Sequence, residues 1–368
     1  MKKYDYLIVG SGLFGSTVAF ELNKRGYKTL VIEKRNHIGG NIFTSFEEGI
    51  NVHKYGAHIF HTSNKEIWDY VNQFATFNDF INSPLADFNG ERYHLPFNMN
   101  TFKEIWPDIE TKEDVIAHIE EEKKTANITD IKNLEDQAIS LVGTTIYEKL
   151  VKGYTEKQWG RQCKDLPSFI IKRLPLRFEY NNNYFNDTYQ GIPLGGYTQI
   201  CEKMLKDSDV LLNVDFLDDK KKYLSMADKT IYTGALDDFF SCKFGSLDYR
   251  SLRFEEETLD IPDYQNNAVI NYTSSSLPYT RIIEHKHFED NFSPKTIITK
   301  EYPLEYQKGF EKYYPINDEK NQTLYSKYLE ETKSLNNIYF GGRLASYKYF
   351  DMDDTIEAAL NLVNEILA

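Results

Sequence analysis

Apolar positions in the first forty residues follow the order strand, turn, helix, strand. Residues 6–9 form a short uninterrupted apolar run, as in a buried strand, and lead into a glycine-rich turn. Apolar residues at helical spacing between Phe14 and Leu22 then predict an amphipathic helix that ends near Gly26. A second buried-type strand follows at residues 29–32. The pattern therefore predicts a βαβ unit at the N-terminus.

The turn inside this unit carries the spacing G-x-G-x-x-G, with Gly10, Gly12 and Gly15 at the three glycine positions. The first glycine permits a tight turn, the second lets a pyrophosphate approach the backbone, and the third lets helix and strand pack closely. Free N–H groups at the helix start would bind the pyrophosphate. Glu33, at the end of the second strand, would accept hydrogen bonds from an adenosine ribose. We therefore predict a dinucleotide site; the simpler alternative is a glycine-rich turn in an ordinary βαβ unit.

Helical spacing returns in the middle of the chain. Thr111 and Asp114 form a capping-box signal at the start of one expected helix. A stripe over residues 134–142 predicts a second helix that stops near Gly143, and residues 146–151 fit a third. The region is therefore interpreted as a helical insertion.

From residue 178 to about residue 310 the pattern changes to short strands and turns. Strands are expected at residues 268–272 and 296–299, and two further strands, at residues 210–214 and 229–234, are expected to join the nucleotide-binding sheet. Near the C-terminus, a buried-type strand at residues 338–340 precedes a glycine pair and a last amphipathic helix. This chain return is typical of FAD-binding folds.

Charge and cysteine content narrow the function classes. The 368 residues carry a net charge of −13, which disfavours general nucleic-acid binding. An anionic substrate would need a local arginine cluster. The three cysteines form no CxxC pair or disulfide framework, and no apolar run is long enough to span a bilayer. We therefore expect a cytoplasmic protein without membrane insertion.

Longer motifs carry a family resemblance. The segment from Glu33 to Asn41, E-K-R-N-H-I-G-G-N, resembles the flavin oxidoreductase and amine oxidase superfamily, which implies FAD rather than NAD. Residues 55–62 read Y-G-A-H-I-F-H-T, and residues 153–160 read G-Y-T-E-K-Q-W-G. Together with shorter motifs up to residue 353, these segments closely resemble the bacterial UDP-galactopyranose mutases over essentially the whole chain.

The resemblance implies an enzyme that interconverts UDP-galactopyranose and UDP-galactofuranose without net redox change. It implies FAD that is active when reduced, with the flavin N5 as nucleophile at the anomeric carbon, and NAD(P)H or another reductant to activate it. It also suggests a homodimer. The runner-up substrate is UDP-N-acetylgalactopyranose, with the same chemistry.

The predicted fold class is α/β, with a Rossmann-like FAD-binding domain, a helical insertion domain and an antiparallel-sheet substrate domain. The expected boundaries are residues 1–62, 190–240 and 330–368 for the FAD-binding domain, 103–178 for the helical domain with a mobile substrate loop, and 63–102, 179–189 and 241–329 for the sheet domain.

The resemblance also implies site residues. Two arginines, Arg173 and Arg281, are expected to bind the diphosphate and act in catalysis, because a bidentate guanidinium suits a departing diphosphate. Substrate contacts are expected from Asn82, Tyr154, Thr155, Trp159, Tyr184, Arg250, Asn271, Glu301, Tyr314, Tyr349 and Asp351. Cofactor contacts are expected from Gly10, Gly12, Phe14, Gly15, Glu33, Lys34, Gly40, Asn41, His58, Ile59, Arg343, Asp351, Met352, Asp353 and Thr355.

Two departures and two alternatives accompany this interpretation. Ala57 stands where the family pattern has proline, which should loosen the loop beside the flavin, and Leu150 and Val151 replace bulkier aromatic residues. Gly153 and Gly160 are interpreted as hinges of a mobile loop around Trp159. The competing functions are a flavin oxidase or monooxygenase on the same scaffold, and a non-catalytic FAD-bound scaffold protein.

Overall fold

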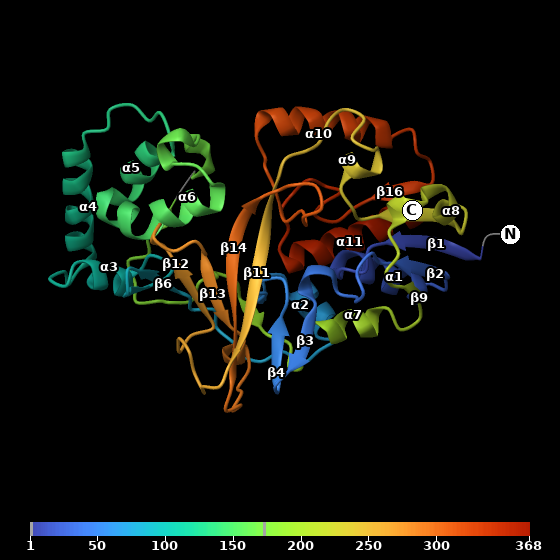
Figure 1. Cartoon of the computed structure of the whole chain (residues 1–368), viewed down its shortest axis with the longest axis horizontal. Helices are drawn as coiled ribbons and strands as arrows, with labels where there is room; N and C mark the ends of the chain where they lie inside the picture. Colours follow the sequence, from blue (N-terminus) through green and yellow to red (C-terminus); the bar gives the residue numbers. More distant parts are fainter. Residues whose placement is uncertain (1–2, 172–173) are drawn as a thin grey trace.

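The computed structural model describes residues 3–171 and 174–368 and contains three groups of elements (Figure 1). A parallel sheet with its helices lies on one side, a long-stranded second sheet lies in the middle, and a cluster of helices lies on the opposite side. Among the described residues, no helix combines the length and apolar character needed to cross a membrane.

The parallel sheet is built on the predicted βαβ unit. Its order is β16-β10-β1-β2-β9 within the described chain, with bounds β1 Tyr4–Val9, β2 Thr29–Ile32, β9 Asp209–Leu211, β10 Ala227–Tyr232 and β16 Ile338–Phe340. Helix α1 (Leu13–Lys24) starts directly after the glycine turn. Leu7 and Ile8 of β1 are fully buried because helices cover both faces of a parallel sheet. The predicted strands at residues 29–32 and 338–340 are confirmed.

The last helix, α11 (Met352–Leu367), packs along α1. Ala359 and Val363 of α11 share a buried apolar cluster with Val18 and Leu22 of α1. The chain end therefore returns to the first βαβ unit, and the start of α11 lies beside the glycine turn.

The second sheet has the order β15-β11-β14-β13-β12-β6-β7 over the described residues. Neighbours are antiparallel except for β6 and β12, which run parallel. The bounds are β6 Leu85–Phe88, β7 Glu91–His94, β11 Tyr249–Leu259, β12 Val269–Tyr272, β13 Arg281–Glu284, β14 Thr296–Glu305 and β15 Tyr314–Pro315. The strand expected at residues 296–299 extends to Glu305 because it pairs with β11 along its whole length.

The helical group packs around its own core. It comprises α3 Met99–Ile105, α4 Lys112–Ala126, α5 Leu134–Ile146, a π-helical segment Tyr147–Lys152 and α6 Gly153–Trp159. The predicted capping box of Thr111 and Asp114 is present at the start of α4. The predicted stop near Gly143 is confirmed: Gly143 leaves the helical region at φ +80°, ψ 172°, and a second helical stretch follows this kink to the end of α5 at Ile146. The Glu122 carboxylate, which accepts hydrogen bonds from Thr145, holds the resumed turn.

Shorter elements connect these groups. They are β3 Thr44–Glu47 paired with β4 Ile50–His53, β5 Phe60–Thr62 paired with β8 Tyr189–Gly191, and helices α2 Lys65–Val71, α7 Thr198–Met204, α8 Lys220–Leu224, α9 Leu236–Phe239 and α10 Glu319–Thr332. The strand expected at residues 210–214 is shorter than predicted, since Asn213 adopts φ +57° and turns the chain away after β9.

The α/β fold class is confirmed, with a helical insertion and a largely antiparallel second sheet. The domain boundaries stay a prediction. Helix α3 begins at Met99, four residues before the proposed helical boundary, and α2, which was assigned to the sheet domain, packs against α11 of the nucleotide-binding group.

Candidate active site

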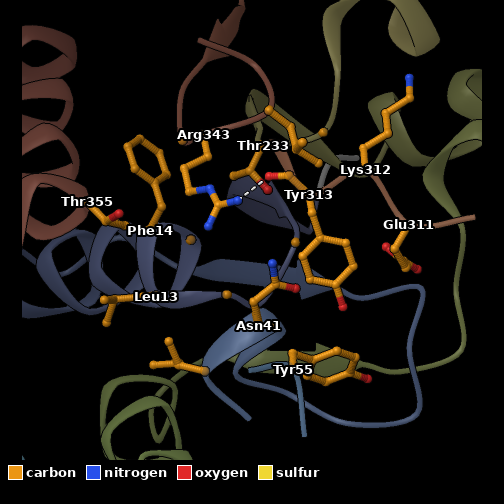
Figure 2. Close-up of a pocket in the computed structure, with 18 of the residues that line it drawn as sticks. Leu13, Phe14, Asn41, Tyr55, Thr233, Glu311, Lys312, Tyr313, Arg343 and Thr355 are labelled. Carbon is orange, nitrogen blue, oxygen red and sulfur yellow. Dashed lines mark hydrogen bonds between the residues drawn. The ribbon is translucent and has the colours of Figure 1, made fainter. Parts of the chain in front are cut away.

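A cavity of about 800 Å³ is lined by residues of both large sheets and of the loops between them. The glycine turn, residues 32–35 and the end of β10 line it from the parallel sheet. Arg281, Glu301 and Tyr314 line it from the second sheet, and residues 308–313 line it from the loop between β14 and β15. Figure 2 shows these segments converging, with Phe14 and Thr355 on one side and Tyr55 and Glu311 on the other.

The glycines of the turn are required by close contacts. A Cβ on Gly15 would lie 2.0 Å from the Gly10 carbonyl oxygen, and a Cβ on Gly10, which has φ +104°, would lie 2.2 Å from Thr233 Oγ1. A Cβ on Gly40 would lie 2.9 Å from Gly12 Cα. The second glycine pair therefore packs on the first turn itself, which keeps the floor of the cavity free of side chains.

Glu33 is buried at the end of β2 and is already partly engaged. One carboxylate oxygen accepts hydrogen bonds from Ser11 N and Ser11 Oγ, each at 2.9 Å, and the other accepts one from Arg35 N at 2.9 Å. An ionised carboxylate offers about four acceptor positions. Glu33 can thus still accept a further hydroxyl donor from inside the cavity.

The segment after β16, residues 341–343, lies beside the glycine turn and closes this end of the cavity. Phe14 lies against the glycine pair after β16, because a Cβ on Gly341 would lie 2.3 Å from the Phe14 ring. Arg343 donates a hydrogen bond from Nη2 to the Tyr313 carbonyl oxygen, drawn as a dashed line in Figure 2. Its guanidinium carbon lies 5.3 Å from the Tyr349 ring centroid. Arg343 thus joins the two sides of the cavity.

The start of α11 forms another wall. Asp351 is the N-cap residue of α11, and Tyr349 donates a hydrogen bond to its Oδ1 at 3.0 Å. Met352 and Thr355 line the cavity on the same helix. Asp353 is not among the described residues that line the cavity; burial raises the pKa of its carboxyl, and the Thr62 hydroxyl opposes this shift.

His58 lies on the loop between β4 and β5 and lines the cavity. Its Nδ1 lies 2.8 Å from the Gly56 carbonyl oxygen, so Nδ1 carries the proton and Nε2 is the acceptor. Burial lowers the pKa of His58 to about 4, so the ring is neutral at pH 7. The backbone N–H of His58 donates to the ring Nδ1 of His53, and the backbone N–H of His53 donates to the ring Nδ1 of His285. These contacts hold the loop that carries Ala57; the looser loop expected from the missing proline stays a prediction.

Arg281 is the centre of the substrate-side predictions. It begins β13 and donates from Nε to Asn271 Oδ1 at 3.0 Å and from Nη2 to the Tyr154 hydroxyl at 3.3 Å. The buried Glu301 carboxylate lies 3.8 Å from Nη1. Burial alone would lower the pKa of Arg281, but the phenol of Tyr154 and the Glu301 carboxylate raise it, so the guanidinium stays charged.

A smaller pocket of about 50 Å³ adjoins this arginine. Arg281, Glu301 and Tyr314 line both this pocket and the large cavity. Tyr154 and Arg250 line the small pocket, and the buried Arg250 Nε has no hydrogen-bond partner among the described residues. Burial raises the pKa of Tyr314, as it raises that of Tyr349 to about 12, so both phenols remain proton donors. The site therefore presents arginines and hydroxyl donors suited to an anion.

The remaining predicted substrate residues lie around this centre. Tyr184 is exposed, and its backbone N–H donates to the Asn82 carbonyl oxygen at 2.8 Å. Thr155 is buried on α6, and Trp159 packs against the core of the helical group. None of these four side chains is among the described residues that line the two pockets. Arg173 lies outside the described residues.

Residues 153–159 form the helix α6 rather than a loop, and the motion expected about Gly153 and Gly160 stays a prediction. Gly153 is helical and begins α6, and a Cβ there would lie 2.3 Å from the Thr273 carbonyl oxygen. Gly160, at φ +66°, ends the helix. Gly153 is thus required by close packing of α6 on the second sheet.

Several cavity residues were missed from the sequence. They include Leu13, Arg35, Tyr55, Thr233, Glu311, Lys312 and Tyr313, most of which Figure 2 labels. Arg35 and Tyr55 carried a signal, since they lie in the motifs at residues 33–41 and 55–62. Glu311 belongs to no motif and reaches the cavity only through the fold.

Comparisons with known proteins agree with this geometry. The family model of UDP-galactopyranose mutase matches residues 149–349, and that of an NAD(P)-binding Rossmann-like domain matches residues 8–74. The chain is 39% identical to a probable UDP-galactopyranose mutase of Klebsiella pneumoniae, over 100% of this chain and 96% of the relative. It is 36% identical to the dTDP-fucopyranose mutase of Escherichia coli, over 96% of each chain.

Solved structures show the same fold. The crystal structure of a reduced UDP-galactopyranose mutase superposes with a TM-score of 0.76 at 15% identity and covers 99% of this chain and 96% of that chain. A putrescine oxidase matches with a TM-score of 0.55 at 12% identity, covering 99% of both chains.

Proposed function

The chain belongs to the UDP-galactopyranose mutase family of isomerases, and from this premise we propose that it interconverts UDP-galactopyranose and UDP-galactofuranose on reduced FAD. The family supports ring interconversion of a nucleotide sugar, and the Rossmann-like domain supports a flavin cofactor. The preferred sugar, the reduced state of the flavin and the roles of individual residues are part of the proposal.

The residues of the large cavity fit a flavin dinucleotide. Gly10, Gly12 and Gly40 leave a side-chain-free floor, and Glu33 retains an acceptor position for a ribose hydroxyl. When bound and reduced, FAD would supply a nucleophilic N5 for the anomeric carbon of the sugar. Neutral His58, whose Nε2 is an acceptor, would border the flavin, and the N-terminus of α11 would favour negative charge beside it.

The protein would then bind and orient the leaving diphosphate. Arg281 would neutralise charge on the diphosphate oxygens, and Tyr314 and Tyr349 would donate their hydroxyl protons as hydrogen bonds to the same oxygens. Asn271 accepts a hydrogen bond from Arg281 Nε and Tyr154 accepts one from Nη2, and the remaining guanidinium N–H groups would bind the diphosphate. Arg173 is proposed as the second diphosphate ligand from the family pattern.

One observation carries this proposal: Arg281 lines both the dinucleotide cavity and the small pocket beside α6. A diphosphate held there would connect a nucleoside near Tyr154 with a sugar facing the flavin. An amine oxidase would have no use for a partly buried arginine that donates to the Tyr154 hydroxyl and shares its pocket with Tyr314.

A second substrate class is supported by the comparisons. The dTDP-fucopyranose mutase is almost as similar to this chain as the first relative, 36% against 39% identity. That name implies a thymine base and a 6-deoxy sugar, so base and sugar both remain to be tested. UDP-N-acetylgalactopyranose stays the alternative proposed from the sequence.

The test is a product assay by liquid chromatography. Dithionite-reduced protein is incubated with UDP-galactofuranose, with its 2-acetamido analogue and with dTDP-fucofuranose, and oxidised protein is the control. We expect pyranose product only after reduction, fastest with UDP-galactofuranose. Equal turnover by oxidised protein would overturn the flavin role, and consumption of oxygen and NAD(P)H in proportion to product would indicate an oxidase.

Activation in the cell would require NAD(P)H or another reductant, and we propose a homodimer in the cytoplasm. Size-exclusion chromatography with light scattering tests the dimer, since the mass should be twice that of the 43.1 kDa chain.

A further inference from the structure

Arg35 is held rigidly at the edge of the large cavity, although no family motif assigned it a role. Its side chain is only 15% exposed, and its guanidinium carbon lies 4.3 Å from the Tyr55 ring centroid. Nη2 donates to Asn41 Oδ1 at 3.1 Å and to Glu311 Oε2 at 3.2 Å. Nη1 is buried and has no hydrogen-bond partner within the described part of the chain.

A buried guanidinium N–H without an acceptor is costly. The contacts of Arg35 with Tyr55, Asn41 and Glu311 prevent the side chain from swinging out to water. The residue also lines the cavity together with Glu33 and Asn41. An anionic ligand oxygen at this end of the cavity would complete its hydrogen bonding.

Glu311 is fixed from the opposite side of the cavity. Its carbonyl oxygen accepts a hydrogen bond from Ser251 Oγ of β11 at 2.7 Å. The next residue, Lys312, forms a buried ion pair with Asp237 at 3.1 Å. The Glu311 carboxylate is therefore anchored to the second sheet, while the arginine that it holds follows β2 of the parallel sheet.

Glu311 is shared by two cations. Its single carboxylate faces both Arg35, at 3.2 Å, and Lys34, at 3.1 Å. The Lys34 side chain is 54% exposed and that of Arg35 is 15% exposed, so solvent screens the Lys34 pair more, although the shared Glu311 side chain is itself 39% exposed. Arg35 is the buried cation of this trio, and the buried Glu33 carboxylate, which accepts a hydrogen bond from the Arg35 backbone N–H, is the second acid beside it.

We propose that Arg35 binds a phosphate oxygen of the dinucleotide and that Glu311 is the positioning residue that holds the guanidinium in place. The inference rests on the proposed binding of a flavin dinucleotide in this cavity. It adds a cationic ligand to a phosphate site otherwise formed by backbone N–H groups, and it makes cofactor affinity depend on a contact between the two sheets.

The test uses apoprotein and isothermal titration with ADP, adenosine and FAD. Arg35→Met keeps the apolar stem but removes the charge. We expect the Kd for ADP to rise roughly tenfold, the usual scale for a charge-assisted hydrogen bond, and the Kd for adenosine to stay within about twofold. If the Kd values for ADP and adenosine rise by the same factor, Arg35 has only a structural role. If the unaltered protein binds neither ADP nor FAD, the proposed dinucleotide site itself is wrong.

Glu311→Gln tests the positioning role. We expect a smaller rise in the ADP Kd than for Arg35→Met, and no further rise when Glu311→Gln is added to Arg35→Met, because the glutamate acts through the arginine. Unchanged or tighter ADP binding by Glu311→Gln would overturn the positioning role of Glu311. So would a double variant whose ADP Kd rises by the product of the two single effects.

Arg253→Met is the matched control. Arg253 also stacks on a tyrosine, 4.0 Å from the Tyr302 centroid, and pairs with Glu255, but it lies on the exposed face of the second sheet. We expect its ADP and FAD affinities to equal those of the unaltered protein. An equal loss in this control would mean that the Arg35 effect is not specific to the cavity.

Discussion

The two ends of the large cavity are built in different ways. At the dinucleotide end, backbone contacts dominate, because glycines from two neighbouring segments pack against each other and exclude side chains. At the diphosphate end, side chains from α6, β12, β13 and β14 converge on Arg281. Adding a methyl group should therefore disturb the dinucleotide end most, whereas removing a side chain should disturb the diphosphate end most.

Loss of a single side chain at the diphosphate end should have the largest effect on turnover. We expect Arg281→Ala to lower kcat by a factor on the order of 10² to 10³, the scale for removing one donor to a developing oxyanion. FAD should remain bound, since Arg281 is held by Asn271 and Tyr154 rather than by the glycine turn. Product formation and flavin absorbance of the same sample measure both.

Arg281→Lys sharpens this result. Lysine keeps the charge but loses the Nε contact to Asn271 and the bidentate fork, so we expect an intermediate kcat. Loss of flavin together with turnover in either variant would show that the two ends of the cavity are not separable.

An added methyl group at the dinucleotide end should affect folding instead. The Cβ of Gly15→Ala would lie 2.0 Å from a backbone oxygen that cannot move aside easily. We expect a loss of about 3 kcal/mol in the free energy of unfolding, measured in urea, and loss of bound flavin.

Gly12→Ala is the control for that change. Gly12 has φ −67°, and its Cβ would meet only Gly40 Cα, at an ordinary 3.8 Å. We expect stability within about 1 kcal/mol of the parent but weaker FAD binding, because the methyl group would face the pyrophosphate. If Gly12→Ala and Gly15→Ala are equally unstable, the distinction between packing and ligand glycines fails.

The same contrast explains what could be predicted from the sequence. The glycine turn, α1 and β2 are consecutive in the chain, so local pattern and turn chemistry were sufficient to predict them. Glu311 and Thr233 reach the cavity only when distant strands pair, and no local signal marks them. The packing requirement at Gly153 was not predicted, because it comes from the Thr273 carbonyl oxygen, 120 residues away in the chain.

The family motifs predicted some of the residues that local patterns could not. Arg281, Glu301, Tyr314 and Tyr349 were selected by resemblance, and the structure brings them to the cavity. Asn82, Thr155, Trp159 and Tyr184 were selected in the same way, but their side chains do not line it in this conformation. Their roles as substrate contacts stay a prediction.

Hydrogen bonds from Lys157 of α6 to the second sheet and the loop after it allow a third test, of whether α6 positions the substrate. Lys157 donates from Nζ to the carbonyl oxygens of Tyr272, Ser274 and Tyr279 at 2.6, 2.8 and 2.9 Å. Lys157→Met would leave these acceptors without the ammonium, at a cost of about 2 kcal/mol in unfolding free energy. Since α6 carries Tyr154, the KM of the nucleotide sugar should rise several-fold, with FAD retained.

Lys152→Met serves as the matched control in the same helical region. Lys152 pairs with the exposed Glu148 at 3.0 Å, and its ammonium lies 5.8 Å from the Tyr147 ring centroid, so we expect stability to change by less than about 0.5 kcal/mol. An unchanged KM in Lys157→Met would indicate that α6 does not position substrate.

The smallest expected effect lies at the far end of β13 from Arg281. There His287 Nε2 lies 3.3 Å from the buried Glu284 carboxylate and 3.2 Å from Asp263. The nearby Glu284 carboxylate raises the pKa of His287 despite partial burial. A raised pKa in the folded state means that the stabilisation is complete below the unfolded pKa, about 6.5, and is lost as pH rises through the folded value.

We therefore expect the free energy of unfolding to fall by about 1 kcal/mol as the pH rises from 6 to 8, and His287→Gln to remove this dependence. Turnover should be unchanged in His287→Gln, because the four residues of β13 separate Glu284 from Arg281 by about 10 Å. Urea unfolding and kcat at both pH values are the measurements. A change in kcat without a change in stability would mean that β13 transmits strain to Arg281, and that the diphosphate end is not held by its local contacts alone.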